Sequence, residues 1–485
     1  MRECKLIIKD EVNVKIEGLD LDTRKRLTNK FKYEVPYARY LPAVRLGRWD
    51  GKVGFFQLGG STYINLLPEI LQDLDDHDWD IELEDLRDYK INYEFTEVDT
   101  ESYADIMWPK GHPAAGQPIE LRDYQVEIIN NFLKNTQSIQ EIATGAGKTI
   151  MTAALSERVE QYGRSIVIVP NKSLVTQTEK DYRNMQLDVG VFYGDRKEFG
   201  HRHTICTWQS LNVLLKNTKR GTVDITIGEF LEDVVCVIVD EVHQAKADAL
   251  KTLLTGVMSH VPMRWGLTGT IPKEQFEWQA IHVALGPVIN HVAASELQQR
   301  GVLAQCNVNV VQLVDHAEHQ NYQSELKYLL EEPGRLDTIS SLVQQVKETG
   351  NTLILVDRIS AGTALQERLP GSVFISGSTK AVDRQEQYDE VQEATNKIII
   401  ATYGVAAVGI NIPRIFNLVL IEPGKSFVRV IQSIGRGIRK AEDKDHVEIW
   451  DITSTCRFAK RHLTKRKQFY KEANYPFQIE KLEWK

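Results

Sequence analysis

A glycine-rich turn between a strand-like and a helix-like segment constrains this chain most. It lies in EIATGAGKTIMTAAL (141–155), after the strand-like SIQEI and before a helix-like run that closes at Gly163. In a strand–loop–helix of this kind, backbone N–H groups and the positive end of the helix bind phosphates. Lys148 would reach the β- and γ-phosphates, and Thr149 would hold Mg²⁺. A strict G-x-x-x-x-G-K-T motif needs glycine where this chain has Ile142, so Gly145 supplies the flexibility instead.

Short apolar runs after residue 110 predict the scaffold around this loop. They alternate with helical stretches, which is typical of parallel strands buried on both faces and joined by crossover helices. The runs are 165–170, 234–240, 264–270, 352–357, 372–376, 397–403, 417–423 and 447–453. This length of chain is enough for two doubly wound parallel-sheet domains joined near residue 295.

Residues 1–110 follow a different pattern. CKLIIKDEVNVKIEG predicts a hairpin around Asp10-Glu11, and DLDTRKRLTNKF predicts a short helix. Gly-containing turns at 50–51 and 59–60 would reverse further strands. We expect a small α+β domain that ends in the Pro/Gly-rich linker WPKGHPAAGQP.

The first half of this domain is basic and aromatic. Between positions 21 and 60, nine Lys and Arg residues stand against three acidic ones, interleaved with Tyr, Trp and Phe. This composition suits a nucleic-acid surface, for which the candidates are Arg45, Arg48, Trp49 and Lys52. A solvated basic helix beside an aromatic core would give the same composition. The net charge of -8 gives no overall attraction to nucleic acid, so any binding must rest on local surfaces.

The cysteines and the apolar runs bear on the cellular compartment. The five cysteines are far apart and form no C-x-x-C pair, which argues against a zinc knuckle, an iron–sulfur cluster or a secreted disulfide scaffold. The long uncharged run IIIATYGVAAVGINIP is shorter than a membrane span of about 18 to 20 apolar residues and is interrupted by Gly, Tyr and Asn. We expect no signal peptide, no membrane segment and a cytoplasmic location, in the host cytoplasm if the chain is viral.

A pair of acidic residues ends the apolar run VIVDEVH. At such a strand end, Asp240 could orient the Mg²⁺ hydration shell while Glu241 polarises the attacking water, and His243 follows two positions later. Acidic residues after a strand can also merely cap the next helix. In combination with the GAGKT turn, the pair predicts nucleotide hydrolysis.

Arginines near the C-terminus are candidates for the same reaction. SFVRVIQSIGRGIRK places Gln432, Arg436 and Arg439 on one face of a helix. Arginine can neutralise a γ-phosphate through two hydrogen bonds, so an arginine finger is predicted. A solvated basic stripe or a helix that contacts the DNA backbone would have the same sequence pattern.

The last part of the chain is also basic. RFAKRHLTKRKQFYK is either a second phosphate-binding surface or a charged helix face packed on the second lobe. Its basic residues are Arg457, Lys460, Arg461, Lys465, Arg466, Lys467 and Lys471.

Taken in order, eight segments resemble the motifs of superfamily 2 helicases. They are LRDYQ (121–125), ATGAGKT (143–149), IVPNKSLVTQ (168–177), TICTWQSL (204–211), DEVH (240–243), LTGT (267–270), ATYGVAAVGINIP (401–413) and QSIGRGIRK (432–440). The DExH form and the QSIGRGIR ending look most like the branch that contains XPB-type and RecG-type enzymes. With its N-terminal domain and lysine-rich end, the whole chain resembles a phage recombination and branch-migration helicase.

The resemblance implies two RecA-like lobes behind the small α+β domain. The expected boundaries are 1–110 for the nucleic-acid-binding domain and linker, 111–295 for the ATP-binding lobe, 296–455 for the C-terminal helicase lobe, and 456–485 for a basic tail. Only the first lobe has a GKT turn, so one ATP would close two lobes, and this closure would move the protein along a strand.

The resemblance also implies roles for individual residues. Arg122, Tyr124 and Gln125 would lie near the adenine. Thr144, Gly145, Ala146, Gly147, Lys148, Thr149 and Gly409 would bind the nucleotide. Lys148, Asp240, Glu241, Gln432, Arg436 and Arg439 would be catalytic, with Mg²⁺ on Thr149 and Asp240. His243, Thr268, Gly269 and Thr270 would couple hydrolysis to motion, and Asn171, Thr207, Gly377 and Thr402 would hold the nucleic-acid backbone.

The expected function is an ATP- and Mg²⁺-dependent DNA helicase or translocase. By resemblance it would act on branched DNA in recombination, repair and replication, through branch migration of four-way (Holliday) junctions, fork regression, and unwinding of displacement loops and RNA–DNA hybrids. The expected partners are branched and single-stranded DNA and recombination proteins, with no membrane, and the protein is expected to be a monomer. The alternatives are an RNA helicase, the motor subunit of a restriction or repair complex, and a slow nucleotide-gated DNA clamp.

Overall fold

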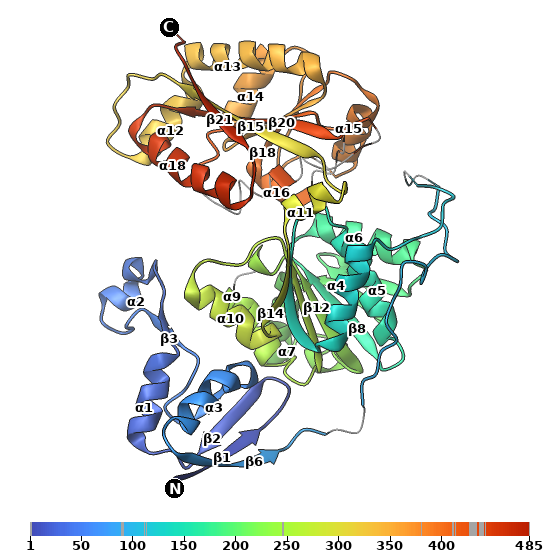
Figure 1. Ribbon diagram of the computed structural model, residues 1–485, viewed down its shortest axis with the longest axis vertical. Coiled ribbons are helices and arrows are strands. Elements are labelled where there is room, and N and C mark those ends of the chain that lie inside the picture. The colour runs from blue at the N-terminus through green and yellow to red at the C-terminus, as the bar shows by residue number, and fades with distance from the viewer. Residues whose placement is uncertain are drawn as a thin grey trace. The chain divides into compact units, whose positions relative to one another are not determined.

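The computed structural model divides into two compact units (Figure 1). One comprises residues 1–141 and 147–291, and the other comprises 142–146 and 292–485. The structure describes residues 2–88, 92–110, 112, 114–244, 247–379, 381–409, 412, 414–425, 434–435, 441 and 443–484. Within these ranges, no helix is both long and apolar enough to cross a bilayer. All five cysteines are buried and carry free thiols.

The N-terminal domain is a four-stranded sheet with helices beside it. The predicted hairpin forms from β1 (Arg2–Ile8) and β2 (Asn13–Glu17), and the sheet order is β5-β2-β1-β6. The remaining elements are α1 (Leu21–Lys30), β3 (Lys32–Glu34), η1 (Ala38–Tyr40), α2 (Pro42–Arg45), β4 (Lys52–Gly54), β5 (Ser61–Tyr63), η2 (Ile64–Leu66), α3 (Leu67–Asp75) and β6 (Trp79–Asp85). Alternate residues of β1 are buried, because only one face of the sheet meets the core.

This domain shares its core with the first lobe. Ala280 and Val283 of α10 (Gln275–Leu285) pack into the N-terminal core, and Phe276 of the same helix packs against Val35 and Ala38. The two parts of this unit are therefore joined by buried apolar surface.

The first lobe is built on an eight-stranded sheet of order β10-β9-β11-β8-β12-β13-β7-β14. Its strands are β7 (Gln137–Ile142), β8 (Arg164–Val169), β9 (Val189–Tyr193), β10 (Arg196–Lys197), β11 (His203–Thr207), β12 (Val234–Asp240), β13 (Met263–Thr268) and β14 (Val288–Val292). Its other helices are α4 (Asp123–Lys134), α5 (Lys148–Val159), α6 (Lys172–Asn184), α7 (Trp208–Arg220), α8 (Ile227–Phe230), η3 (Val242–Gln244) and α9 (Ala247–Thr255). The pairs β11–β8, β8–β12, β12–β13 and β13–β7 are all parallel.

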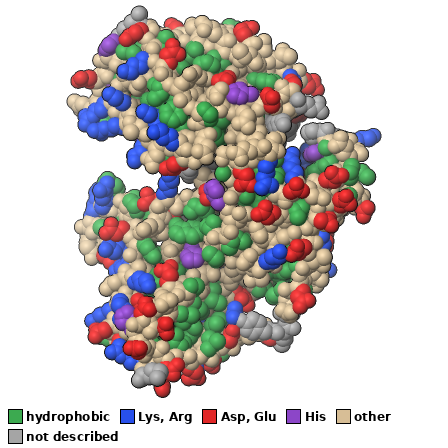
Figure 2. Space-filling model, viewed as in Figure 1, with side chains coloured by type: hydrophobic (Ala, Val, Ile, Leu, Met, Phe, Trp, Pro, Cys, Tyr) green, Lys and Arg blue, Asp and Glu red, His purple; other side chains and the backbone are tan. Residues whose placement is uncertain are grey.

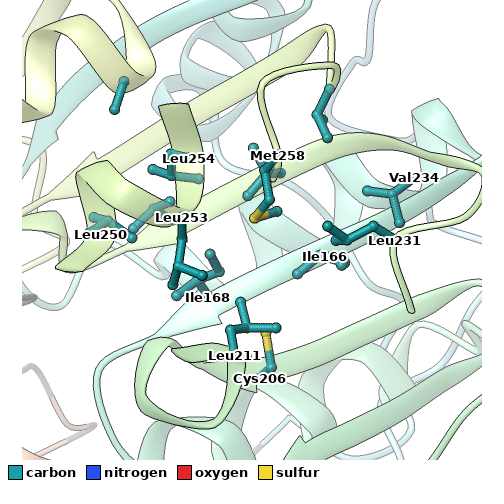
Figure 3. Close-up of a cluster of buried hydrophobic side chains, with 14 of the residues drawn as sticks. Ile166, Ile168, Cys206, Leu211, Leu231, Val234, Leu250, Leu253, Leu254 and Met258 are labelled. Carbon is teal, nitrogen blue, oxygen red and sulfur yellow. The ribbon is translucent and has the colours of Figure 1, made fainter. Parts of the chain in front are cut away.

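Apolar side chains from strands and helices hold this lobe together. Figure 3 shows Ile166 and Ile168 of β8 among Leu211 of α7 and Leu253 of α9, and all four are at most 1% exposed. Successive residues of β8 and β12 are buried on both faces of the sheet, so these strands carry unbroken apolar runs.

The second lobe is a seven-stranded sheet of order β17-β18-β16-β19-β20-β15-β21. Its strands are β15 (Gln305–Leu313), β16 (Thr352–Val356), β17 (Val373–Ile375), β18 (Ile398–Thr402), β19 (Asn417–Ile421), β20 (His446–Ser454) and β21 (Phe477–Leu482). Its helices are α11 (Ala294–Gln299), α12 (Tyr322–Glu331), α13 (Pro333–Val346), η4 (Lys347–Thr349), α14 (Ile359–Arg368), α15 (Ala381–Glu393), α16 (Tyr403–Gly409) and α18 (Arg457–Glu472). The predicted α/β class with two parallel-sheet lobes is confirmed.

The C-terminal residues belong to this lobe and do not form a separate tail. Strand β21 pairs with β15 in parallel, from Val308 with Phe477 to Leu313 with Leu482. The sequence analysis predicted neither of these strands.

Candidate active site

The predicted phosphate loop lies between β7 and α5. Gly145 and Gly147 have φ angles of 91° and 79°, a region that side-chain-bearing residues rarely adopt. A Cβ on Gly147 would also stand 2.6 Å from Nε2 of Gln125, so a side chain there would displace the Gln125 amide. Ile142, which stands where the strict motif has its first glycine, is a fully buried residue at the end of β7. Helix α5 begins at Lys148, directly after the loop.

An ion pair joins the loop to the acidic strand end. Lys148 Nζ lies 2.9 Å from Glu241 Oε1, and both side chains are about nine-tenths buried. Asp240 ends β12, and its Oδ1 accepts a hydrogen bond from the Glu241 backbone N–H. The first-lobe residues predicted to bind phosphate and to activate water are therefore neighbours.

The environment of these carboxylates is unusual in two ways. Burial raises the pKa of Asp240, the nearby Glu241 raises it further, and Lys148 opposes both effects. Glu241 has a φ of 51°, which costs a residue with a side chain about 1 to 3 kcal/mol. Backbone strain of this kind is concentrated at functional sites, where surrounding contacts hold it in place.

A histidine connects Glu241 with the next strand. His243 Nδ1 lies 2.6 Å from Thr268 Oγ1 and 3.6 Å from Glu241 Oε2. Thr268, at the end of β13, donates its hydroxyl proton to the Thr270 carbonyl at 2.7 Å. Burial lowers the pKa of His243, so this relay carries a neutral imidazole. Gly269 N lies 3.5 Å from Glu241 Oε2, which brings all four predicted coupling residues to one strand edge.

One residue of the site was missed by sequence reasoning. Thr149 Oγ1 donates a hydrogen bond to Asp181 of α6. Burial raises the pKa of Asp181, while the Thr149 hydrogen bond and Lys180 oppose this effect. An acceptor at this place directs the hydroxyl proton away and leaves the Thr149 lone pairs free for a cation. Asp181 lies near the C-terminal end of α6 and belongs to no motif, so nothing in the sequence marked it.

The residues predicted near the adenine form a local cluster at the start of α4. The Arg122 backbone N–H donates to Gln125 Oε1 at 3.0 Å, and Arg122 Nη1 approaches the Tyr124 hydroxyl at 3.4 Å. Tyr124 and Gln125 are buried. Gln125 also faces Gly147, which links this cluster to the phosphate loop.

The predicted second-lobe contributions are described only in part. Gly409 is the last residue of α16. Gln432, Arg436 and Arg439 lie outside the described residues, so their roles remain predictions.

Comparison with known proteins assigns the family. The family described as "Type III restriction enzyme, res subunit" matches residues 118–273, and the "Helicase conserved C-terminal domain" family matches residues 334–441. Together these matches contain the phosphate loop, the acidic pair and the motif segments of the second lobe.

This chain is a superfamily 2 helicase.

The helicase resembles named relatives over most of its length. It is 22% identical to the ATP-dependent DNA helicase uvsW of Enterobacteria phage T4, over 98% of this chain and 95% of the relative. It is 25% identical to the DNA 3'-5' helicase XPB of Kineococcus radiotolerans, over 74% of this chain and 64% of the relative. The ATP-dependent Type ISP restriction-modification enzyme LlaBIII bound to DNA shares the fold, with a TM-score of 0.56 at 16% identity over 86% of this chain and 34% of that one. The helicase is therefore an ATP-driven enzyme.

Within each lobe of the helicase, predicted nucleic-acid residues lie at the carboxyl ends of adjacent strands. Asn171 follows β8 and Thr207 ends β11, and each caps the helix that follows, accepting from the Leu174 and Ser210 N–H groups. In the second lobe, Gly377 follows β17 and Thr402 ends the neighbouring β18. A Cβ on Gly377 would meet nothing within 4 Å, so its backbone is open to close approach.

The candidate nucleic-acid residues of the N-terminal domain divide into two groups. Arg45, Arg48 and Lys52 are exposed, whereas Trp49 packs against the cluster around Phe276 and donates its indole N–H to the Lys52 carbonyl at 2.8 Å. Phe55 and Phe56 are 1% exposed and belong to the domain core. The cations therefore remain candidates for phosphate contacts, while these aromatic residues serve mainly in packing.

Proposed function

We propose that this helicase couples ATP hydrolysis to movement on branched DNA. The proposed reactions are branch migration of four-way junctions, fork regression, and unwinding of displacement loops and RNA–DNA hybrids. The proposal rests on a chain of contacts that runs from Lys148 through Glu241 and His243 to Thr268. These contacts link the phosphate loop to the adjacent strand ends. The full-length similarity to a phage DNA helicase supports DNA as the substrate.

The residues of the site suit an ATP–Mg²⁺ complex. Mg²⁺ prefers hard oxygen ligands, keeps several waters and binds through one or two carboxylates plus phosphates. Thr149 and Asp240 provide such oxygens, and the Thr149 proton already points to Asp181. The described residues contain no group of three or more His, Cys, Asp or Glu that would hold an ion. When bound, Mg²⁺ would neutralise charge on the phosphates.

The Lys148–Glu241 pair suggests how the site would be activated. If Lys148 binds the β- and γ-phosphates, it gives up its 2.9 Å contact with Glu241. The freed carboxylate can then accept a proton from the attacking water. Glu241 Oε2 already lies near His243 and the Gly269 N–H. A movement of this carboxylate away from Lys148 would therefore alter its contacts with the 268–270 segment.

The DNA contacts follow from the strand-end positions in each lobe. Backbone amides and hydroxyls near 171, 207, 377 and 402 would hold phosphates without reading bases, so translocation would be largely independent of sequence. Arg45, Arg48 and Lys52 would add phosphate contacts outside the lobes.

The proposal is tested by strand exchange on a labelled four-way junction. The wild type should convert the junction into two duplexes with ATP and not without it, and Lys148→Ala should abolish the reaction. No conversion by the wild type, with efficient unwinding of an RNA duplex in the same assay, would contradict the proposal and favour an RNA helicase.

A second candidate is a motor that translocates on duplex DNA without separating strands. It is favoured by the match to the restriction-enzyme res-subunit family over 118–273. Displacement of a triplex-forming strand from linear duplex, without junction conversion, would select this function.

A further inference from the structure

Helix α18 presents a long basic face to solvent. The helix has 16 residues and is about 24 Å long, and all of its residues are described. Glu472 is the single acidic residue along it. Lys and Arg side chains gather over this helix in Figure 2. The exposed basic residues are Arg457, Lys460, Arg461, Lys465 and Lys471.

These charges have no carboxylate partners in the described part of the chain. By contrast, other surface cations of the same lobe are paired, such as Arg414 with Asp443 at 2.8 Å and Lys397 with Glu390 at 3.1 Å. Like charges at helical spacing repel one another and destabilise an isolated helix. An uncompensated stripe of this length therefore indicates an anionic partner.

The opposite face of α18 is fixed rigidly to the lobe. Arg466 is fully buried and makes a bidentate pair with Asp451 at 2.7 and 2.9 Å, and Tyr470 donates to the same carboxylate at 2.7 Å. At the helix start, Glu325 accepts from the N–H groups of Phe458 and Ala459. Of the two alternatives that the sequence left open for this stretch, Arg466 follows the packed helix face, because its charge anchors the helix to the lobe, whereas the other basic residues named above are exposed.

A pocket of about 780 Å³ adjoins the first turns of α18. It lies between this helix and the segment 315–319, and Arg457, Lys460 and Arg461 line it. His319 also lines it, and its buried Nε2 has no hydrogen-bond partner among the described residues. Two acidic residues also line the pocket. The Asp315 carboxylate accepts hydrogen bonds from Arg335 and Ser454, and Glu318 is exposed. The pocket therefore offers three cations and an unsatisfied imidazole to an anion.

The chemistry of the face selects one kind of anion. Phe469 and Tyr470 are buried in the lobe and Phe458, which is half-buried, lies near Tyr322, so no aromatic side chain of this fully described helix is exposed. Proteins that bind single strands combine cations with exposed aromatic rings on which bases stack. A straight row of cations without such rings fits the phosphates of a base-paired helix, whose bases are already stacked.

We propose that the basic face of α18, with the pocket at its start, binds the phosphate backbone of a duplex DNA arm. The inference rests on the proposed function, because it names a surface that would hold one arm of the branched substrate. The bound backbone would run along the helix, with one phosphate in the pocket near His319.

The test is equilibrium binding of a labelled duplex without nucleotide, across a series of salt concentrations. The triple variant Lys460→Gln, Arg461→Gln, Lys465→Gln should bind the duplex more than about tenfold more weakly at 50 mM salt. The slope of log K against log salt should become shallower by up to about 0.9 per lost contact. The charge-preserving variant Lys460→Arg, Arg461→Lys, Lys465→Arg should bind like the wild type.

A charge-matched control is Lys347→Gln, Lys397→Gln, Lys481→Gln, which removes three cations from the same lobe outside the α18 face. The inference is overturned if this control variant loses as much duplex affinity and salt slope as the α18 variant does. It is also overturned if the α18 variant binds duplex DNA like the wild type, or if its affinity for single-stranded DNA falls as much as its affinity for duplex DNA. Failure of the wild type to bind any DNA would instead contradict the proposed function, so the two failures are distinguishable.

Discussion

Lys148 Nζ lies 2.9 Å from Glu241 Oε1, so the cation of the phosphate loop and the carboxylate of the DExH segment form a buried ion pair. This contact joins two residues that are 93 positions apart in the sequence into one site. Each partner offsets the desolvation of the other, since a buried charge is costly without a counter-charge.

Glu241→Gln should retain a hydrogen bond to Lys148 while removing the group that accepts a proton from water. We expect ATP turnover to fall by about 10² to 10⁴, with ATP binding preserved, because this is the range that a positioned general base contributes. Steady-state hydrolysis and nucleotide binding measured on the same preparation check this. Turnover within a factor of two of wild type would exclude Glu241 as the base.

Asp181→Ala should weaken the use of Mg²⁺, because Thr149 would lose the acceptor that orients its hydroxyl. Outer partners of metal ligands typically contribute about 10- to 100-fold to affinity or activity. The Mg²⁺ concentration for half-maximal ATP hydrolysis should therefore rise, with less change for Asp181→Asn, which keeps an acceptor. A Mg²⁺ dependence identical to wild type in both variants would show that Asp181 only packs.

Arg466→Met should destabilise the protein by about 3 to 5 kcal/mol, because it leaves Asp451 buried without its cation. The double variant Arg466→Met, Asp451→Leu should recover part of this loss, since both charges are then gone. Denaturant unfolding measures both variants. If the double variant is less stable than Arg466→Met, the hydrogen bond from Tyr470, rather than the ion pair with Arg466, is what stabilises the buried Asp451 carboxylate.

The stability of the helicase should fall in acid partly through His462. Burial, then Arg466 and Lys425, lower the pKa of this imidazole to about 4, against about 6.5 in an unfolded chain. Between pH 6.5 and 4 the unfolded state binds a proton that the folded state does not, so stability present above pH 6.5 is lost as the pH falls. His462→Phe keeps a ring beside Tyr322 and should show a smaller loss of melting temperature between pH 7 and pH 5 than the wild type. Equal losses would contradict this assignment.

Much of the fold is predictable because it follows from local pattern. The apolar run 234–240 coincides with β12, and Gly145 and Gly147 have the positive φ angles that the phosphate loop requires. The missed strand β15 alternates apolar and polar residues at its start, CNVNV, and lacks the continuous apolar run used to find the others. Strand β21 is mostly exposed, so its sequence carries little of the apolar signal.

The site was predictable as far as its motifs extend. Lys148, Glu241 and His243 could be found because their chemistry depends on short spacings, whereas Asp181 and Arg466 depend on partners far along the chain. Composition alone also could not separate the exposed Arg45 and Arg48 from the buried Phe55 and Phe56, because burial is decided by packing against α10.

Branched DNA is proposed to drive ATP turnover at this site. The most direct test is steady-state ATP hydrolysis, measured at one fixed salt concentration with no nucleic acid, single-stranded DNA, single-stranded RNA, linear duplex DNA and a four-way DNA junction. The junction should stimulate hydrolysis most strongly, and Lys148→Ala should show no stimulation. Strongest stimulation by RNA, or by linear duplex alone, would contradict this proposal.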